Sequence, residues 1–393
     1  MLATWVAVVS TAPEVQAGAE PGRAWDDAAL AELPAGTRPE PLTWERAYTL
    51  ALVRYRSPRL ANGQAPAVSL DPATLARQAE RLGVSDIERF RKDFFTTRRV
   101  PPDDEPTFVD PSGSLFDLLR RLQALENARK FVTALEELKA AYQEANAVAT
   151  LPRPRRFEGW LEKGRTRFQN ELRAYRDRLG QVKAELGLAQ NAPVVPDRNS
   201  LAGFRSVFDK VEEWFRDPNR NPADLRTIVA RLPRLPDRVL GRISLDGATG
   251  SEPKGQNEAL RAVEQVLAEG RAALDADVGP RARRRVARLL ELRAAYREEP
   301  RQYLLALQAK DQAFEQLMMP PPPGVVLRVP DLIALHERSL QSEDRLVVLW
   351  ASFQAERLAL ARDLHLLPVD DWASFLAQLQ SEPASGTASS GKR

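Results

Sequence analysis

Apolar residues recur at steps of three and four along residues 115–149 and again along residues 157–187. Such steps place side chains on one face of an α-helix, so both segments predict long amphipathic helices. A proline-rich break at residues 151–154 separates them, and Gly187 ends the second. We therefore expect one helical hairpin over residues 114–188, with a first arm on the order of 50 Å long. Arms of this length bury little against each other, so they need a further partner surface, either within the chain or on another subunit.

A second hairpin follows the same pattern. Its outgoing arm is expected over residues 281–319 with a kink at Pro300, and its return arm over residues 332–364. The turn between the arms is the run PPPPG, Pro320 to Gly324. The return arms of the two hairpins end in similar segments, YRDRLGQVKAELGL and FQAERLALARDLHL. This weak similarity predicts two structural repeats rather than one bundle.

Shorter elements fill the rest of a mainly α fold with little or no β structure. Capping residues predict helix starts at Thr43, Asp71, Ser85, Ser114 and Asn221. A strand is expected only over residues 239–245. The expected organisation is an extended leader over 1–42, a first repeat over 43–188, a linker with short helices over 189–280, a second hairpin and final helix over 281–380, and a disordered tail over 381–393.

Composition excludes some chemistry and leaves the compartment open. The chain of 393 residues has no cysteine, so it forms neither disulfides nor thiolate metal sites. Its net charge of +3 comes from 57 basic and 54 acidic residues that are mixed along the chain, so nucleic-acid binding is not expected. Residues 2–9 are apolar and precede a small-residue AGA site, but no Lys or Arg comes before them. An export signal with a misplaced start and an ordinary leader both fit this segment. No segment approaches the ~20 apolar residues of a membrane-spanning helix.

Catalysis, metal binding and cofactor binding are not expected. The chain has two histidines, His336 and His365, and neither has a second histidine at metal-binding spacing, so we expect both on helix surfaces. The run GSEPKG over residues 250–255 lacks the lysine and hydroxyl ending of a phosphate loop. The carboxylate pairs 136–137 and 298–299 lie among Lys and Arg residues and are interpreted as solvated helix faces. Without a nucleophile and base, the sequence predicts a protein that is not an enzyme.

The densest basic run, RARRR over residues 281–285, allows two interpretations. It is either a contact for phosphate or an acidic surface, or the charged first turn of an exposed helix. Positive charge at a helix start opposes the helix dipole, so an acidic neighbour is expected to compensate it. Trp160, Trp214 and Trp350 lie on apolar faces and are expected in the core.

Several segments resemble the TolC-like family of outer-membrane efflux proteins. Residues 42–53 (LTWERAYTLALV) are similar to the opening helix of that family, and residues 90–95 (FRKDFF) fit versions of it. Residues 114–188 resemble its first coiled hairpin, and residues 313–372 resemble its last hairpin and tail. The resemblance covers about two thirds of the chain in pieces. It implies a trimeric homo-oligomer with a periplasmic helical tunnel and strands in the outer membrane, bound to a periplasmic adaptor and an inner-membrane pump.

The sequence departs from this family where membrane strands are expected. Strands that cross a membrane need ~9–11 residues of alternating polarity, and residues 55–71 and 233–256 do not supply them. The first turn is also basic and proline-rich, and the export signal is incomplete. These departures indicate a shortened, divergent relative, and the alternative is a soluble helical scaffold without a pore. The expected partner contacts at the hairpin tips are Arg153, Arg155, Arg156, Pro320 and Gly324, and the expected assembly face includes Leu122, Leu125, Leu346 and Trp350.

Overall fold

The computed structural model describes residues 31, 33, 37–56, 71–81, 112–148, 155–217, 219–236, 238–240, 243–244, 253–269, 278–318 and 329–364. This part of the chain is mainly helical, and its strands are two or three residues long. The mainly α fold predicted from sequence is therefore confirmed. No helix in these ranges is both long enough and apolar enough to cross a membrane.

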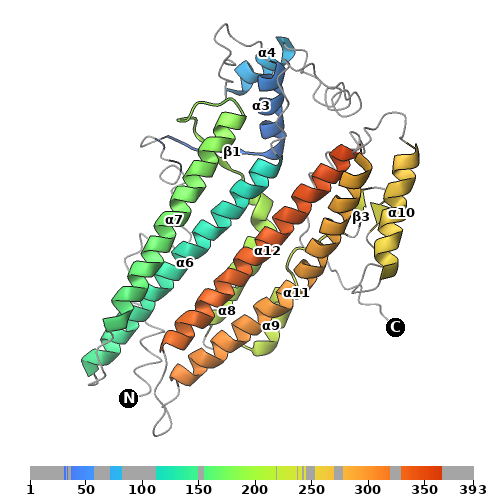
Figure 1. The fold of residues 1–393 in the computed structure, drawn as a ribbon. Coiled ribbons are helices and arrows are strands. Elements are labelled where there is room, and N and C mark those ends of the chain that lie inside the picture. Colours follow the sequence, from blue (N-terminus) through green and yellow to red (C-terminus); the bar gives the residue numbers. More distant parts are fainter. Residues whose placement is uncertain are drawn as a thin grey trace, which may run out of the picture.

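Two long helical hairpins dominate the molecule (Figure 1). The first consists of α6 (Ser112–Val148) and α7 (Arg155–Glu185), and the second of α11 (Val278–Met318) and α12 (Val329–Asp363). The four arms lie side by side in the order α7, α6, α12, α11, so each hairpin brings one arm to the middle. The paired arm ends next to the two hairpin turns lie at the same end of the molecule.

The helix boundaries follow local chemistry. Gly187 ends the first hairpin with a φ of 73°, a left-handed conformation that glycine adopts without steric cost. The Gly187 and Leu188 amides then donate to the carbonyls of Ala184 and Lys183 at 3.1 and 2.8 Å, as in a Schellman cap. One expectation was less accurate: Ser114 lies inside α6, which begins at Ser112, so it is not the cap. Pro300 lies inside α11, and the expected kink there stays a prediction.

One hydrophobic core joins both hairpins. It contains apolar residues of all four arms together with residues of α3 (Trp44–Arg56), α8 (Ala202–Arg216) and α10 (Pro253–Glu269). Because α6 packs on α12, the two hairpins form one bundle. That they are also two structural repeats stays a prediction. The further surface that the long arms need is thus supplied within the chain. A smaller apolar cluster of Phe131, Leu135, Phe157, Leu161, Ile333 and Leu340 joins the hairpins nearer their turns.

The N-terminal part is tied to the end of the bundle that lies away from the turns (Figure 1). Strand β1 (Glu40–Leu42) pairs in parallel with β2 (Val194–Pro196), with Glu40 opposite Val194. Helix α3 follows, and its predicted cap is confirmed by a hydrogen bond from the Arg46 amide to Thr43 Oγ1 at 3.3 Å. The indole of Trp44 donates to Ser200 Oγ at 3.3 Å. The strand pair was not predicted, since both segments had been interpreted as extended leader and linker.

The remaining elements cover the bundle. Helix α4 (Pro72–Arg81) is capped by Asp71, and α9 (Pro222–Val229) by Asn221, as predicted. A 3-10 turn (Arg198–Leu201) leads into α8, and α8 and α9 lie behind the four arms in Figure 1. The expected strand near residue 240 is an antiparallel pair, β3 (Arg238–Leu240) and β4 (Ile243–Ser244). The expected helices after Ser85 and over residues 371–380, the leader over 1–30, and the tail lie outside the described residues.

Candidate functional site: the polar seam between the hairpins

The predicted tip residues are only partly described. Arg155 and Arg156 form the first turn of α7, whereas Arg153, Pro320 and Gly324 lie outside the described residues. Their role as partner contacts therefore stays a prediction. The described helices do bring the two turns to one end of the molecule, as partner contact at both tips requires (Figure 1).

The predicted assembly face is buried inside the chain. Leu122 and Leu125 of α6 and Leu346 and Trp350 of α12 are at most 4% exposed, and all belong to the shared core. The ring of Trp350 lies edge-on to Phe116 at 5.7 Å between ring centres. Contacts within the chain therefore occupy these side chains, and an interface with another subunit would have to use other residues.

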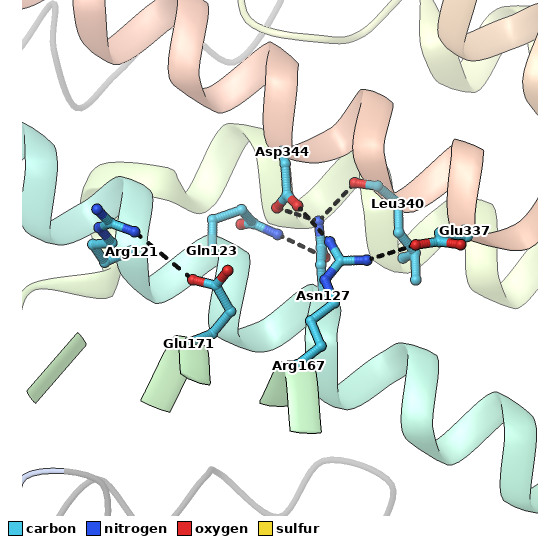
Figure 2. A network of polar contacts seen from close by, with 8 residues as sticks. All are labelled: Arg121, Gln123, Asn127, Arg167, Glu171, Glu337, Leu340 and Asp344. Atoms are coloured by element: carbon cyan, nitrogen blue, oxygen red, sulfur yellow. Dashed lines mark hydrogen bonds and ion pairs between the residues drawn. The ribbon is translucent and has the colours of Figure 1, made fainter. Parts of the chain in front are cut away.

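A polar network crosses the middle of the bundle, where α6 faces α12 (Figure 2). Asn127 of α6 is fully buried and donates from its amide to the Leu340 carbonyl at 3.1 Å and to Asp344 Oδ1 at 2.8 Å. Gln123, one turn earlier, donates to the Asn127 side-chain oxygen at 3.0 Å. We call the residues drawn in Figure 2 the polar seam: Arg121, Gln123, Asn127, Arg167, Glu171, Glu337, Leu340 and Asp344.

Helix α7 reaches the polar seam through Arg167. Its guanidinium lies 3.2 Å from Glu337 and 3.7 Å from Asp344, so one cation is shared by two carboxylates of α12. Glu171, one turn further along α7, lies 3.9 Å from Arg121. Three helices from both hairpins thus meet in one network of charged and amide groups.

The electrostatics of the polar seam are set by burial. Loss of hydration raises the pKa of Asp344 to about 7, although Arg167 and the Asn127 amide both favour the charged carboxylate. The nearby carboxylates Glu343 and Glu171 raise the pKa further. Asp344 is therefore the acidic group of the polar seam that changes charge near neutral pH.

A second buried group of charges adjoins the polar seam around Glu343 of α12. The Tyr303 hydroxyl of α11 donates to Glu343 Oε1 at 2.8 Å, and both residues are at most 4% exposed. Lys130 of α6 pairs with Glu212 of α8 at 2.6 Å. Burial raises the pKa of Glu343, while Lys130 and Lys310 oppose this rise. Burial also lowers the pKa of Lys310 to about 8. These contacts join α6, α8, α11 and α12, with the Lys130–Glu212 pair partly exposed.

His336 is half-buried and its ring nitrogens are inaccessible to water, which corrects the expectation of an exposed position on a helix surface. Both ring nitrogens are buried without a hydrogen-bond partner, and the ring stacks on Phe131 with 6.1 Å between ring centres. Burial, with the positive charges of Lys310 and Lys130, lowers the pKa of His336 to about 3. The imidazole is therefore neutral at physiological pH and acts as a packing group. His365 lies outside the described residues.

Two of the four arginines in the basic run at the start of α11 pair with carboxylates of the same chain. Arg285 contacts Asp363 at 2.6 Å and Glu356 at 2.7 Å, both on α12, and Arg283 lies 3.7 Å from Glu264 of α10. These carboxylates are the acidic neighbours that the helix-dipole argument called for. They favour a structural role for the run over a phosphate contact.

The carboxylate pairs differ from expectation at one position. Glu136 and Glu298 are exposed, but Glu299 is 7% exposed and pairs with Arg345 at 2.8 Å.

Within the described ranges no group of three or more His, Asp or Glu side chains is placed to hold a metal. An open hollow of about 460 Å³ beside the polar seam is lined by residues of α7 alone, between Glu162 and Glu171. The polar seam can bind a proton at Asp344, and its hydrogen bonds fix the position of α6 relative to α12.

Sequence reasoning missed the polar seam, although its spacing left a trace. Gln123 and Asn127 are four residues apart, the spacing that the apolar residues of α6 also show. Glu337, Leu340 and Asp344 follow one another at steps of three and four on α12. Polar residues with this spacing beside an apolar stripe indicate a polar contact between helices, but they do not identify the partner.

The chain matches no model of a known protein family. A search of curated proteins and a search of solved structures also found no match.

Proposed function

We propose that the chain is a helical structural subunit that works by assembly with other proteins and not by catalysis, in the manner of the TolC-like export components that its sequence resembles. The observation that supports this is the geometry of the two hairpins, which run side by side with both turns at one end (Figure 1). An elongated body with both tips at one end suits docking onto a second protein. In this proposal the chain acts in the cell envelope, and the tips contact an adaptor linked to an inner-membrane pump.

Assembly into a homo-oligomer is part of this proposal, with the trimer taken from the family resemblance. Its contacts are the polar outer faces of the arms, because the apolar faces are buried within one chain. The exposed side of α7 carries both acidic and basic residues, including Glu158, Glu162, Arg165 and Arg173. Such a surface favours contacts through complementary charges, which weaken as salt concentration rises.

A second candidate function is a soluble helical scaffold without a conduit. Burial of Leu122, Leu125, Leu346 and Trp350 inside one chain favours it, because the hairpins then need no neighbouring copy to cover their apolar faces. This candidate shares the docking role of the tips. It differs in the compartment and in the number of copies.

Fractionation of cells that express the full chain distinguishes the two candidates. The export proposal expects the protein with the outer membrane or periplasm, as an oligomer by light scattering and in a cross-linked complex with an envelope protein. In the variant R155E/R156E the cross-link is expected to disappear, while R261E, an exposed charge reversal on α10 and outside the four arms, keeps it. A monomer recovered only from the cytosol, with unchanged helical content, would contradict the export proposal and favour the scaffold.

A further inference from the structure

The charges of the polar seam do not cancel. Figure 2 contains two guanidinium groups, those of Arg121 and Arg167, and three carboxylates, those of Glu171, Glu337 and Asp344. Arg121 is near Glu171, so Arg167 alone serves both carboxylates of α12. One negative charge in this network therefore lacks a full counter-ion.

Asp344 is the carboxylate for which this shortage matters most. Its side chain is 20% exposed, compared with 40% for Glu337 and 26% for Glu171, so water compensates it least. The closer partner of Arg167 is Glu337, at 3.2 Å, whereas Asp344 lies 3.7 Å away. A negative charge with little water and a shared cation is costly to keep in a protein interior.

The groups that face Asp344 come from every helix of the polar seam. Helix α6 offers the neutral amide of Asn127, and α7 offers Arg167 and the negative Glu171. Its own helix adds the negative Glu343 next to it and Glu337 two turns earlier. Loss of hydration is the largest effect, and together with the neighbouring negative charges it outweighs Arg167, so the pKa of Asp344 rises to about 7.

We propose that Asp344 is a proton-binding site between the two hairpins, and that proton uptake there strengthens the pairing of α6 with α12. A neutral carboxyl group still accepts the Asn127 amide through its carbonyl oxygen, so the hydrogen bond across the seam is kept while the uncompensated charge is lost. Glu337 then has Arg167 to itself. This inference does not depend on the export proposal, because it concerns the joint within one chain.

The sign of the effect follows from linkage. A carboxyl group whose pKa is higher in the folded chain than in the unfolded chain binds its proton more tightly when folded. Its contribution to stability is therefore fully present below the ordinary pKa of 3.8 and is lost as pH rises to about 7. Above that pH the folded chain carries the buried charge. Through Asp344 taken alone, the pairing of the hairpins is therefore stronger below about pH 7 than above it.

A direct test follows the carboxyl carbon of Asp344 by NMR in the full chain labelled at aspartate carboxyl groups, with D344N to assign the signal. The expected midpoint lies near pH 7. In E337Q the midpoint should fall, because Arg167 then serves Asp344 alone, and in R167Q it should rise. The control E136Q, which removes an exposed partner of Arg165, should leave it unchanged.

The effect on pairing is measured by urea unfolding of the wild type and D344N between pH 5 and 8. The wild type is expected to lose stability relative to D344N over this range, with the two curves approaching each other at the acidic end. Parallel curves, or an Asp344 midpoint below about pH 5, would overturn the proposal.

Discussion

The Asn127 amide lies 2.8 Å from a carboxylate oxygen of Asp344, although the residues are 217 positions apart in the sequence. This contact joins a helix of the first hairpin to a helix of the second. The same amide also donates to the Leu340 carbonyl, so it fixes how far α6 is shifted along α12. A buried amide that specifies register is also found in coiled coils.

The substitution N127D tests this contact. It places a second carboxylate against Asp344 in the interior, where like charges repel strongly and water does not compensate them. We expect a loss of about 2–4 kcal/mol in the free energy of unfolding at pH 8, with a smaller loss at pH 5, where one proton can be shared. Urea unfolding at the two pH values measures both quantities.

The control N170D makes the same chemical change on the exposed side of α7. It should alter the free energy of unfolding by no more than about 0.5 kcal/mol. If the two variants lose equal stability, or if the loss in N127D is independent of pH, the contact between Asn127 and Asp344 does not join the hairpins.

Two buried tyrosines on α11 separate the effect of a charged acceptor from that of a neutral one. Tyr303 donates to the carboxylate of Glu343, and Tyr296 donates to the backbone carbonyl of Pro233. Removing a hydroxyl from a buried charged acceptor costs more than removing it from a neutral one. We expect Y303F to lose about 1.5–3 kcal/mol and Y296F about 0.5–1.5 kcal/mol.

Thermal and urea unfolding of both tyrosine variants at pH 7 measure the difference. Both substitutions remove one oxygen atom from a side chain that is at most 4% exposed. The two variants therefore lose a similar amount of packing, and the difference between them reports on the hydrogen bond. An equal or smaller loss in Y303F would mean that Glu343 accepts this hydrogen bond as a neutral carboxyl group at this pH, contrary to the prediction.

His336 predicts the acid sensitivity of the fold. Its pKa falls from 6.5 to about 3 on folding, so the unfolded chain binds the proton more tightly. Stability from this group is fully present above pH 6.5 and is lost as pH falls towards 3. We expect H336F, which keeps a ring against Phe131, to unfold at a lower pH than the wild type.

Circular dichroism from pH 7 to pH 2.5 measures this shift. At pH 8 the histidine is neutral in both folded and unfolded chains, so the two proteins should differ there only through packing. Asp344 acts in the opposite direction between about pH 4 and 7, and H336F leaves that effect in place. Identical acid midpoints for wild type and H336F would show that the imidazole reaches water in the folded chain.

The sequence was sufficient for the long helices but not for their contacts. The three-and-four spacing of leucines, the break at residues 151–154 and the stop at Gly187 are local signals, and the structure confirms the hairpin that they predict. Pairing of β1 with β2 is a contact of three residues between distant segments, so local pattern did not show it. Burial of His336 likewise depends on the helix that packs over it.

The polar seam shows the same limit at the candidate site. Asn127 and Asp344 each look like ordinary polar positions beside an apolar stripe, because nothing local shows that the two stripes face each other. The apolar residues of the expected assembly face were assigned to contacts between subunits for the same reason, because local sequence does not show that the two stripes pack on each other. Leu122 and Leu346 were correctly expected to need a partner surface, and that surface is the other hairpin.

Two glycines of α7 give a matched test of the packing between α6 and α7. A Cβ atom at Gly164 would lie 3.3 Å from Leu135 Cδ1 and 3.4 Å from Val132 Cγ2, whereas one at Gly159 would meet nothing within 4 Å. Both positions lie within a helix, where replacing glycine by alanine gains about 1 kcal/mol in the absence of crowding. We expect the free energy of unfolding to rise by about 0.5–1 kcal/mol in G159A and to stay unchanged or fall in G164A.

The larger substitution G164L should lower the free energy of unfolding by about 1–3 kcal/mol or more, because it forces α7 away from the small apolar cluster near the turns. Thermal unfolding of the three variants at pH 7 measures the series, and equal gains in G159A and G164A would contradict the close approach of the two arms at Gly164.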